Sequence, residues 1–225
     1  MDDEDVVRRL ESLSCTDLSD AMDRLGIAGQ CAQIMPISRD YRLVGQAWTL
    51  RYGPVGQDTG SVGDYIDDLG PGQVVVLDNQ GRTDATVWGD LLTSTAHLRG
   101  VAGTVIDGVC RDVDRALELE YPIFSRGNWM RTGKDRVRVE QMGAPVSLGG
   151  IRVEAGDWLR GDGDGLVAIP RRRIEEVLDV AEEVAEAEEH IRQALQAGKS
   201  LRDARAEYGY HTLQTRRVEH EAGAR

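Results

Sequence analysis

The chain has few cysteines and a deficit of basic charge, and both shortages narrow the classes of protein that it can be. Its 225 residues include only three cysteines, Cys15, Cys31 and Cys110. They lack the pair spacing and the histidine companions of a zinc site, so we expect reduced, mostly buried thiols. There are 39 acidic residues against 27 basic ones, a formal net charge of −12. This balance argues against nucleic acid as a direct partner, because binding to its backbone needs a basic face.

Lysine and long apolar stretches are also scarce. The two lysines, Lys134 and Lys199, lie in polar sequence. A lysine that forms a Schiff base is usually set in an apolar pocket or beside another cation, so the sequence does not favour that chemistry. No apolar run approaches the thickness of a bilayer, and the acidic opening at residues 1–5 is unlike a signal peptide. We expect a cytoplasmic protein with no membrane partner.

The length of the chain is enough to bury a sizeable core as one domain. No internal repeat occurs, and no linker rich in proline, glycine or serine divides the sequence. We expect one folded domain over residues 1–210 and a loose polar tail over 211–225.

The middle of the chain alternates apolar runs with helical patterns. Residues 73–78, 101–106 and 122–124 read as short buried strands, and residues 89–99 and 112–120 as helices between them. This β-α-β-α-β order favours parallel strands joined by right-handed crossovers. The sequence therefore predicts an α/β fold.

Other segments supply scaffold. The helix over 89–99 is expected to bury an apolar face, and further helices are expected over 6–26, with Ser14 or Thr16 as a cap, and over 171–197. Strands are expected over 45–52 and, as short antiparallel pieces, over 137–170. A polar surface loop is expected over 53–63, and a tight turn at Asp162 and Asp164. The apolar face of the helix over 89–99 is expected to consist of Leu91, Leu92, Thr95 and Leu98. That of the helix over 171–197 is expected to consist of Ile174, Val177, Leu178, Ala181, Val184, Ile191 and Leu195.

Asp90 and the pair Arg111-Asp112 are the candidate functional residues. Each stands after a predicted strand and at the start of a predicted helix, and ligands of parallel sheets collect at the carboxyl ends of the strands. Two converging carboxylates can hold a hard divalent cation, directly or through water. The arginine offers a planar fork for a carboxylate or a developing oxyanion.

The start of the helix after Gly89 adds a second anion-binding element. Its first-turn amides have no partner within the helix, and Gly89 has no side chain to obstruct an approach. We expect the amides near Leu91 and Leu92 to bind a substrate carboxylate, with Arg111 opposite. A purely structural interpretation competes, since first-turn aspartates complement the helix dipole and Arg-Asp pairs are often surface ion pairs. Spacing alone leaves both interpretations open.

From about Leu13 to Tyr208 the chain resembles the family that contains the 4-hydroxy-4-methyl-2-oxoglutarate/4-carboxy-4-hydroxy-2-oxoadipate aldolases and regulator of ribonuclease E activity A. The aldolase branch is marked by an aspartate, twenty intervening residues and arginine-aspartate, which Asp90, Arg111 and Asp112 match without a gap. The segments that carry the resemblance are Ser19–Gly26, Gly45–Arg51, Gly81–Asp84, Trp88–Leu92, Arg99–Gly103, Asp107–Asp114 and Gly161–Gly165.

The resemblance implies a fold, an assembly and an activity. The fold is an α/β/β/α sandwich of the swivelling β/β/α type, assembled as homotrimers or homohexamers with sites between subunits. The activity is a class II aldolase that forms pyruvate from a small 2-oxo acid and also decarboxylates oxaloacetate. Asp112 would be the direct ligand of Mg²⁺, Mn²⁺ or another divalent cation, and Asp90 a ligand through water. Arg111 would contact the pyruvyl portion and stabilise its enolate.

Two alternatives remain at the level of sequence. The chain could be a non-catalytic regulator that binds ribonuclease E or a helicase partner through its acidic surface. It could also be a related enzyme whose Arg111 site handles another 2-oxo acid or a simple decarboxylation. The complete set of two aspartates and one arginine favours catalysis over pure regulation.

Overall fold

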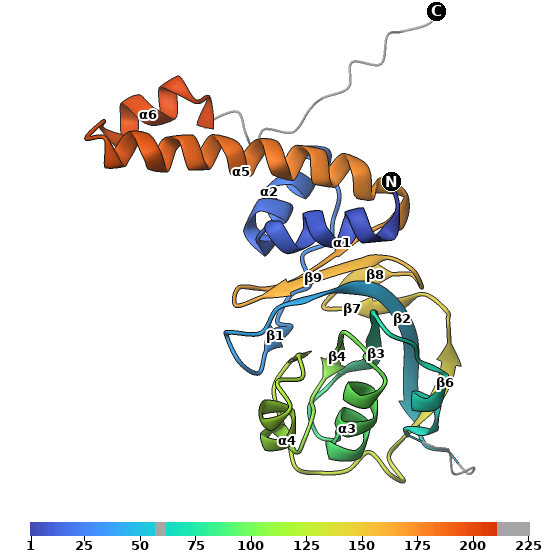
Figure 1. Cartoon of the computed structure of the whole chain (residues 1–225). Helices are drawn as coiled ribbons and strands as arrows, with labels where there is room; N and C mark the ends of the chain where they lie inside the picture. The colour runs from blue at the N-terminus through green and yellow to red at the C-terminus, as the bar shows by residue number, and fades with distance from the viewer. Residues whose placement is uncertain (57–61, 211–225) are drawn as a thin grey trace, which may run out of the picture.

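The computed structural model describes residues 1–56 and 62–210 and consists of helices packed around a mixed sheet (Figure 1). The helices are α1 (Asp3–Ser12), α2 (Cys15–Leu25), η1 (Asp64–Asp68), α3 (Asp90–Leu98), α4 (Val113–Glu118), η2 (Arg171–Arg173), α5 (Ile174–Gln196) and α6 (Leu201–Glu207). The strands are β1 (Met35–Pro36), β2 (Leu43–Pro54), β3 (Gln73–Arg82), β4 (Gly103–Gly108), β5 (Ile123–Ser125), β6 (Val137–Met142), β7 (Val146–Leu148), β8 (Ile151–Val153), β9 (Trp158–Asp162) and β10 (Gly165–Ile169).

The main sheet has the order β1-β5-β4-β3-β2-β9-β10, with β6 paired to β2 beside this path. Strands β2, β3, β4 and β5 are parallel neighbours, and helices α3 and α4 connect β3 to β4 and β4 to β5. The β-α-β-α-β unit predicted from the sequence is therefore confirmed. Strands β6 to β10 pair antiparallel, as expected for the glycine-rich segment after residue 137.

The central strands separate two apolar cores. Along β3, Val74 and Val76 enter a core shared with β9, β10 and the β7-β8 hairpin, whereas Val75 and Leu77 enter a core under α3 and α4. This alternation follows from the period of two in a strand. The layers are thus α3 and α4, the parallel strands, the antiparallel strands, and a second set of helices. The α/β/β/α sandwich expected from the resemblance is confirmed.

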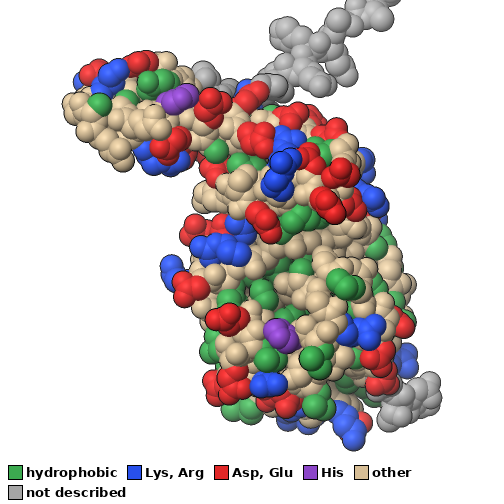
Figure 2. Space-filling view, viewed as in Figure 1, with side chains coloured by type: hydrophobic (Ala, Val, Ile, Leu, Met, Phe, Trp, Pro, Cys, Tyr) green, Lys and Arg blue, Asp and Glu red, His purple; other side chains and the backbone are tan. Residues whose placement is uncertain are grey.

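The second set of helices consists of α1, α2 and α5, which cover β9 and β10 (Figure 1). The capping box of α2 uses Ser14, one of the two caps expected. The apolar stripe of α5 is buried as expected except for Leu195, which lies 39% exposed where the helix runs past the body. Acidic side chains gather over this helical layer in Figure 2, and Arg9 of α1 donates to Asp179 and Glu182 of α5.

The expected apolar face of α3 is buried only in part, because Leu92 packs against the core and the other two leucines do not. Leu91 and Leu98 are 78% and 85% exposed, while Thr93 and Ala96 are fully buried. The small side chains let the helix approach the body closely, and the Thr93 hydroxyl accepts a hydrogen bond from the indole of Trp88. Apolar periodicity misplaced part of the buried face because the fully buried residues of the helix are a threonine and an alanine.

Two expectations fall partly or wholly outside the described part of the chain. The polar loop over 53–63 includes residues 57–61, and the tail comprises 211–225. Within residues 1–56 and 62–210, no helix is both long enough and apolar enough to cross a bilayer.

Candidate active site

The candidate residues lie where the parallel strands β3 and β4 lead into helices. The chain leaves β3 at Arg82 and enters α3 after Gly89; it leaves β4 at Gly108 and enters α4 after Asp112. The main-chain amide of Arg111 donates to the carbonyl of Trp88, at 3.0 Å, and so joins the two connections. Both strand-to-helix junctions therefore share one edge of the sheet, as the sequence predicts.

Asp90, Arg111 and Asp112 meet at this edge. The amide of Asp90 donates to Oδ2 of Asp112 at 3.1 Å, and Nε of Arg111 lies 3.3 Å from the same oxygen. Gly89 passes so close that a Cβ atom there would lie 2.7 Å from Oδ2 of Asp112 and 3.1 Å from Nε of Arg111. Only glycine leaves room for this arrangement.

The backbone of Asp112 is unusual. It precedes α4 in the left-handed region, with φ 55° and ψ 41°. Aspartate tolerates this region better than most side chains, but a non-glycine residue held there is typical of sites where geometry is over-determined. The conformation fixes the direction in which the Asp112 carboxylate leaves the chain, toward the start of α3.

Helix α3 begins without a side-chain cap in the described structure. Its Asp90 amide is engaged by Asp112, and the Thr93 amide bonds back to the carbonyl of Gly89. The amides of Leu91 and Leu92 lie between them in the first turn, where a helix has donors without intrahelical partners and a positive partial charge. This end of α3 can receive an anion.

A cavity of about 250 Å³ opens at this place. The five residues expected to bind substrate, Gly89, Asp90, Leu91, Leu92 and Arg111, all line it. Asp112 is not a lining residue; it borders the cavity through its contacts with Asp90 and Arg111. The remaining described lining residues are Val62, Gly63, Thr86, Val87, Trp88 and Thr132.

Two buried lining residues, Thr86 and Trp88, and the buried Thr93 form a hydrogen-bonded group at the wall of the cavity. The indole of Trp88 donates to Oγ1 of Thr93 at 2.9 Å, and that hydroxyl donates to the carbonyl of Gly89 at 3.0 Å. The hydroxyl of Thr86 donates to the carbonyl of Trp88 at 2.8 Å. Sequence reasoning did not single out Thr86 or Thr93, because a buried threonine carries no periodic signal. Trp88 was included only as part of the resemblance.

The other groups that chemistry could use are set apart from this cavity. Cys110 is buried next to Arg111, and burial raises the pKa of its thiol, which is the opposite of what a nucleophilic cysteine needs. Asp162 and Asp164 form the expected turn, in which the Asp164 amide donates to Oδ1 of Asp162. Over residues 1–56 and 62–210, no cluster of three or more histidine, cysteine, aspartate or glutamate side chains could hold a metal ion.

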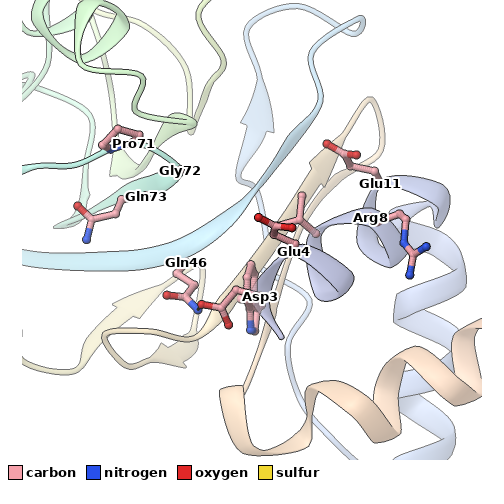
Figure 3. A pocket seen from close by; sticks show the side chains of 10 residues that line it. Asp3, Glu4, Arg8, Glu11, Gln46, Pro71, Gly72 and Gln73 are labelled. Atoms are coloured by element: carbon pink, nitrogen blue, oxygen red, sulfur yellow. The ribbon is translucent and has the colours of Figure 1, made fainter. Parts of the chain in front are cut away.

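A larger cavity of about 420 Å³ lies beside α1, away from these residues (Figure 3). Asp3, Glu4 and Glu11 border it, with Val7 and Trp158 among its apolar lining. At the edge of this cavity, the side-chain amide nitrogen Nε2 of Gln46 donates to Oδ2 of Asp3 at 3.1 Å. The cavity shares no residue with the candidate site, and its lining residue Arg8 pairs with Asp5 of the same helix.

Comparison with known proteins identifies relatives over most of the chain. The RraA-like family model, described as Aldolase/RraA, matches residues 15–168. Protein DlpA of Legionella pneumophila is 36% identical over 208 residues, which cover 91% of this chain and 34% of that protein, so the chain spans about a third of its length. A protein of Halalkalibacterium halodurans named "Putative 4-hydroxy-4-methyl-2-oxoglutarate aldolase" is 31% identical over 177 residues, covering 79% of this chain and 82% of that protein.

The fold has a close counterpart among solved structures. Streptomyces coelicolor RraAS2, described as an unusual member of the RNase ES inhibitor RraA protein family, superposes with a TM-score of 0.78 at 27% identity. The match covers 86% of this chain and 99% of that one. Names in this group thus refer both to aldolases and to an inhibitor of a ribonuclease. With its family model covering more than half of the sequence, the chain belongs to the RraA-like family.

Proposed function

We propose that this chain is a divalent-metal-dependent carbon-carbon lyase that cleaves 2-oxo acids of the 4-hydroxy-4-methyl-2-oxoglutarate type to pyruvate, with oxaloacetate decarboxylation as a side activity. The observation that carries the proposal is the meeting of Gly89-Asp90 with Arg111-Asp112 at one cavity. The name of the Halalkalibacterium relative supports the same chemistry.

Arg111 and the start of α3 bind the pyruvyl half of the substrate. The Arg111 side chain is 40% exposed beside the cavity, so its guanidinium can reach a ligand while Nε stays near Asp112. A guanidinium fork suits a carboxylate, and the Leu91 and Leu92 amides add donors from the helix end. The same donors stabilise negative charge as it develops on the oxygen of the 2-oxo group.

The carboxylates at this edge fit a hard cation. Asp112 would hold it directly and Asp90 through water, since both are oxygen donors and both are exposed. Mg²⁺ is typically held by one or two carboxylates and completes its shell with water and substrate, so a set of two does not exclude it. When bound, the cation supplies Lewis-acid polarisation of the 2-oxo group. A homotrimer or homohexamer would bring a further acidic residue from a neighbouring copy.

Asp90 handles the proton. Cleavage of the bond between C3 and C4 requires a base for the C4 hydroxyl and an acid that later protonates C3. Asp90 lines the cavity and is exposed, so its carboxylate can perform both through an intervening water. Neither Lys134 nor Lys199 lines the cavity, so the described residues provide no amine for a Schiff base.

A lactate dehydrogenase-coupled assay tests the proposal. Pyruvate release would be followed from 4-hydroxy-4-methyl-2-oxoglutarate, 4-carboxy-4-hydroxy-2-oxoadipate and oxaloacetate, with Mg²⁺, Mn²⁺ or EDTA. We expect turnover with metal, its loss in EDTA, and a fall in kcat/KM of roughly 10²- to 10³-fold in Arg111→Ala, the scale for removal of one oxyanion donor. Arg111→Lys should remain impaired because ammonium lacks the planar fork.

Arg115→Ala is the matched control. Arg115 follows in α4 and contacts Ser94 and Glu118 rather than the cavity, so this variant should behave as the unmodified chain. Activity of Arg111→Ala equal to that of Arg115→Ala would refute the assignment. No turnover with any metal, together with tight binding of a ribonuclease, would establish the regulatory alternative instead.

A further inference from the structure

We propose that Thr93 is a positioning residue of the candidate site: its buried hydroxyl fixes the peptide group between Gly89 and Asp90, from which helix α3 begins. The inference rests on the proposed function, because it names a residue that supports the same site. Thr93 lies in α3 but does not line the cavity, so it acts through its neighbours.

The peptide group between Gly89 and Asp90 is not fixed in the usual way. Glycine is the residue type with the greatest backbone freedom. In the described part of the chain, α3 begins without a side-chain cap, although a serine, threonine, aspartate or asparagine at that place commonly fixes the first turn of a helix. The support for this turn therefore comes from another residue.

The Thr93 hydroxyl supplies this support through two hydrogen bonds. The indole nitrogen of Trp88 lies 2.9 Å from Oγ1 of Thr93, and Oγ1 lies 3.0 Å from the carbonyl oxygen of Gly89. An indole can only donate, so the hydroxyl accepts from Trp88 and its single hydrogen is directed at Gly89. Thr93 is 0% and Trp88 1% exposed, and an unpaired polar group in such a place is costly.

The carbonyl that Thr93 holds determines the direction of the next amide. In a planar trans peptide the C=O and the N–H point in opposite directions, and the described residues include no cis peptide. Because the Gly89 carbonyl is directed at Thr93, the Asp90 amide faces the other way. There it donates to Oδ2 of Asp112 at 3.1 Å. Thr93 and Asp112 thus hold the two sides of one peptide group.

The preceding peptide group connects Thr93 to Arg111. The carbonyl of Trp88 accepts from the hydroxyl of Thr86 at 2.8 Å and from the main-chain amide of Arg111 at 3.0 Å. Trp88 therefore contacts Arg111 through its carbonyl and Thr93 through its indole. The Thr93 hydroxyl is connected in this way to both groups that bind the substrate in the proposed function, the start of α3 and the arginine.

A bond from threonine to the carbonyl four residues earlier is common in helices and does not by itself indicate a role. Thr95 makes the same kind of bond, to the carbonyl of Leu91 at 2.8 Å, on the exposed part of α3. The Thr93 hydroxyl differs because it also accepts from a buried indole, and because its carbonyl partner belongs to Gly89 at the site. The two threonines offer a comparison within one helix.

Thr93→Val removes the hydroxyl and keeps the shape of the side chain. Thr104→Val is the control for stability, because Thr104 is also 0% exposed and its hydroxyl lies 2.9 Å from that of Tyr121, outside the cavity. Thr95→Val is the control for a lost bond within the helix. Thr93→Val and Thr104→Val should both lower the unfolding free energy, because each leaves a buried aromatic side chain without its hydrogen-bond partner.

Only Thr93→Val should affect the site. Oxalate, which resembles the enolate of pyruvate, would be titrated calorimetrically with Mg²⁺ present, and kcat/KM would be measured with 4-hydroxy-4-methyl-2-oxoglutarate. We expect both the affinity and kcat/KM to fall roughly 10- to 100-fold, the range for residues that orient binding groups. Thr95→Val and Thr104→Val should match the unmodified chain. Thr93→Ser restores the hydroxyl and should recover most of both quantities.

The outcomes separate this inference from the function on which it rests. A loss of oxalate affinity in Thr93→Val that Thr93→Ser recovers supports the inference, and if the unmodified chain turns over no substrate the proposed function alone fails. Equal affinity and kcat/KM in Thr93→Val and Thr104→Val refute the inference and leave the function. An unmodified chain that neither binds oxalate nor shows turnover refutes both. Thr93→Ala, which is smaller and favours a helix, tests the same hydroxyl if Thr93→Val does not fold.

Discussion

The main-chain amide of Asp90 donates a hydrogen bond of 3.1 Å to the Asp112 carboxylate, 22 residues further along the chain. The bond joins the first residue of α3 to the residue that precedes α4. The same oxygen lies 3.3 Å from Nε of Arg111. One atom of Asp112 therefore contacts both groups that the proposed chemistry uses to bind the substrate, the start of α3 and the Arg111 guanidinium. Among residues 1–56 and 62–210, the second oxygen of Asp112 has no hydrogen-bond partner, so it can bind another ligand.

Replacing Asp112 by asparagine separates its charge from its shape. Asparagine tolerates the left-handed backbone as well as aspartate does and keeps an amide oxygen for the Asp90 amide. We expect kcat/KM to fall by roughly 10²-fold or more, the scale of a lost electrostatic contact in a reaction site. The unfolding free energy should change by less than about 0.5 kcal/mol, as for most exposed positions. Coupled assays and urea denaturation would measure both quantities.

Asp114→Asn serves as the comparison for this variant, because Asp114 is an exposed aspartate in the first turn of the same helix. It should retain the original kcat/KM. If Asp112→Asn and Asp114→Asn lose activity equally, the loss arises from a lower negative charge at the start of α4 and not from the Asp112 carboxylate in particular.

Gly89→Ala tests the closeness of the two junctions. Its backbone is extended, with φ −153°, so alanine meets no conformational strain. The new methyl group would instead displace Oδ2 of Asp112 and Nε of Arg111, which lie 2.7 and 3.1 Å from its position. Both atoms belong to long or partly exposed side chains that can move aside, so the fold should tolerate the change. We expect nearly unaltered thermal stability and a loss of roughly 10²-fold in kcat/KM, the scale for a displacement near 1 Å.

Gly70→Ala is the control for that substitution, since a Cβ atom there would be 3.8 Å from its nearest neighbour, in the side chain of Gln73. It should leave kcat/KM unchanged. A fully active Gly89→Ala enzyme would mean that Asp112 and Arg111 do not need their observed positions.

The order of strands and helices was predictable because each of the central elements is determined mainly by residues that are close together in the sequence. The run Val74-Val75-Val76-Leu77 is apolar throughout, as in a strand that is buried on both faces. Gly89 precedes the helix α3, Gly100 follows it, and Gly108 ends the strand before α4. Once strands and helices alternate, right-handed crossovers bring successive strand ends to one edge. The meeting of Asp90 with Arg111 and Asp112 followed from that topology.

The interior contacts that support the edge were not predictable, because they join residues far apart in sequence. The carboxylate of Asp78 accepts from the amide of Ser147, and that of Asp107 accepts from the amide of Gly149. Asp107 also pairs with Arg126 at 2.5 Å. These buried aspartates attach the β7-β8 hairpin to the strands that carry the site. An aspartate after a strand gives no sign in the sequence of whether it faces a ligand or an amide.

Asp162 shows the same ambiguity at the other end of the molecule. It was expected only to form a turn, yet its Oδ2 also accepts from the amide of Cys15, at 2.8 Å, and so connects β9 to the start of α2. Burial by itself would raise the pKa of the Asp162 carboxyl. Hydrogen bonds from the Cys15 and Asp164 amides and the charge of Arg160 outweigh this, so that its pKa lies below the ordinary value of 3.8.

A lowered pKa in the folded chain means that the ionised carboxylate stabilises the fold fully above the ordinary pKa value, and that this stabilisation is lost as the pH falls from that value through the lower pKa of the folded chain. Asp162→Asn should therefore lower the unfolding free energy at neutral pH, by about 1 to 3 kcal/mol for the loss of a charged acceptor of buried amides. The difference between the two proteins should shrink below about pH 4, which urea denaturation at both pH values would measure. Asp164→Asn, an exposed change in the same turn, should show a small and pH-independent difference. A penalty in Asp162→Asn that is equally large at low pH would arise from altered packing, since the protonated wild-type carboxyl no longer offers the charge that asparagine lacks.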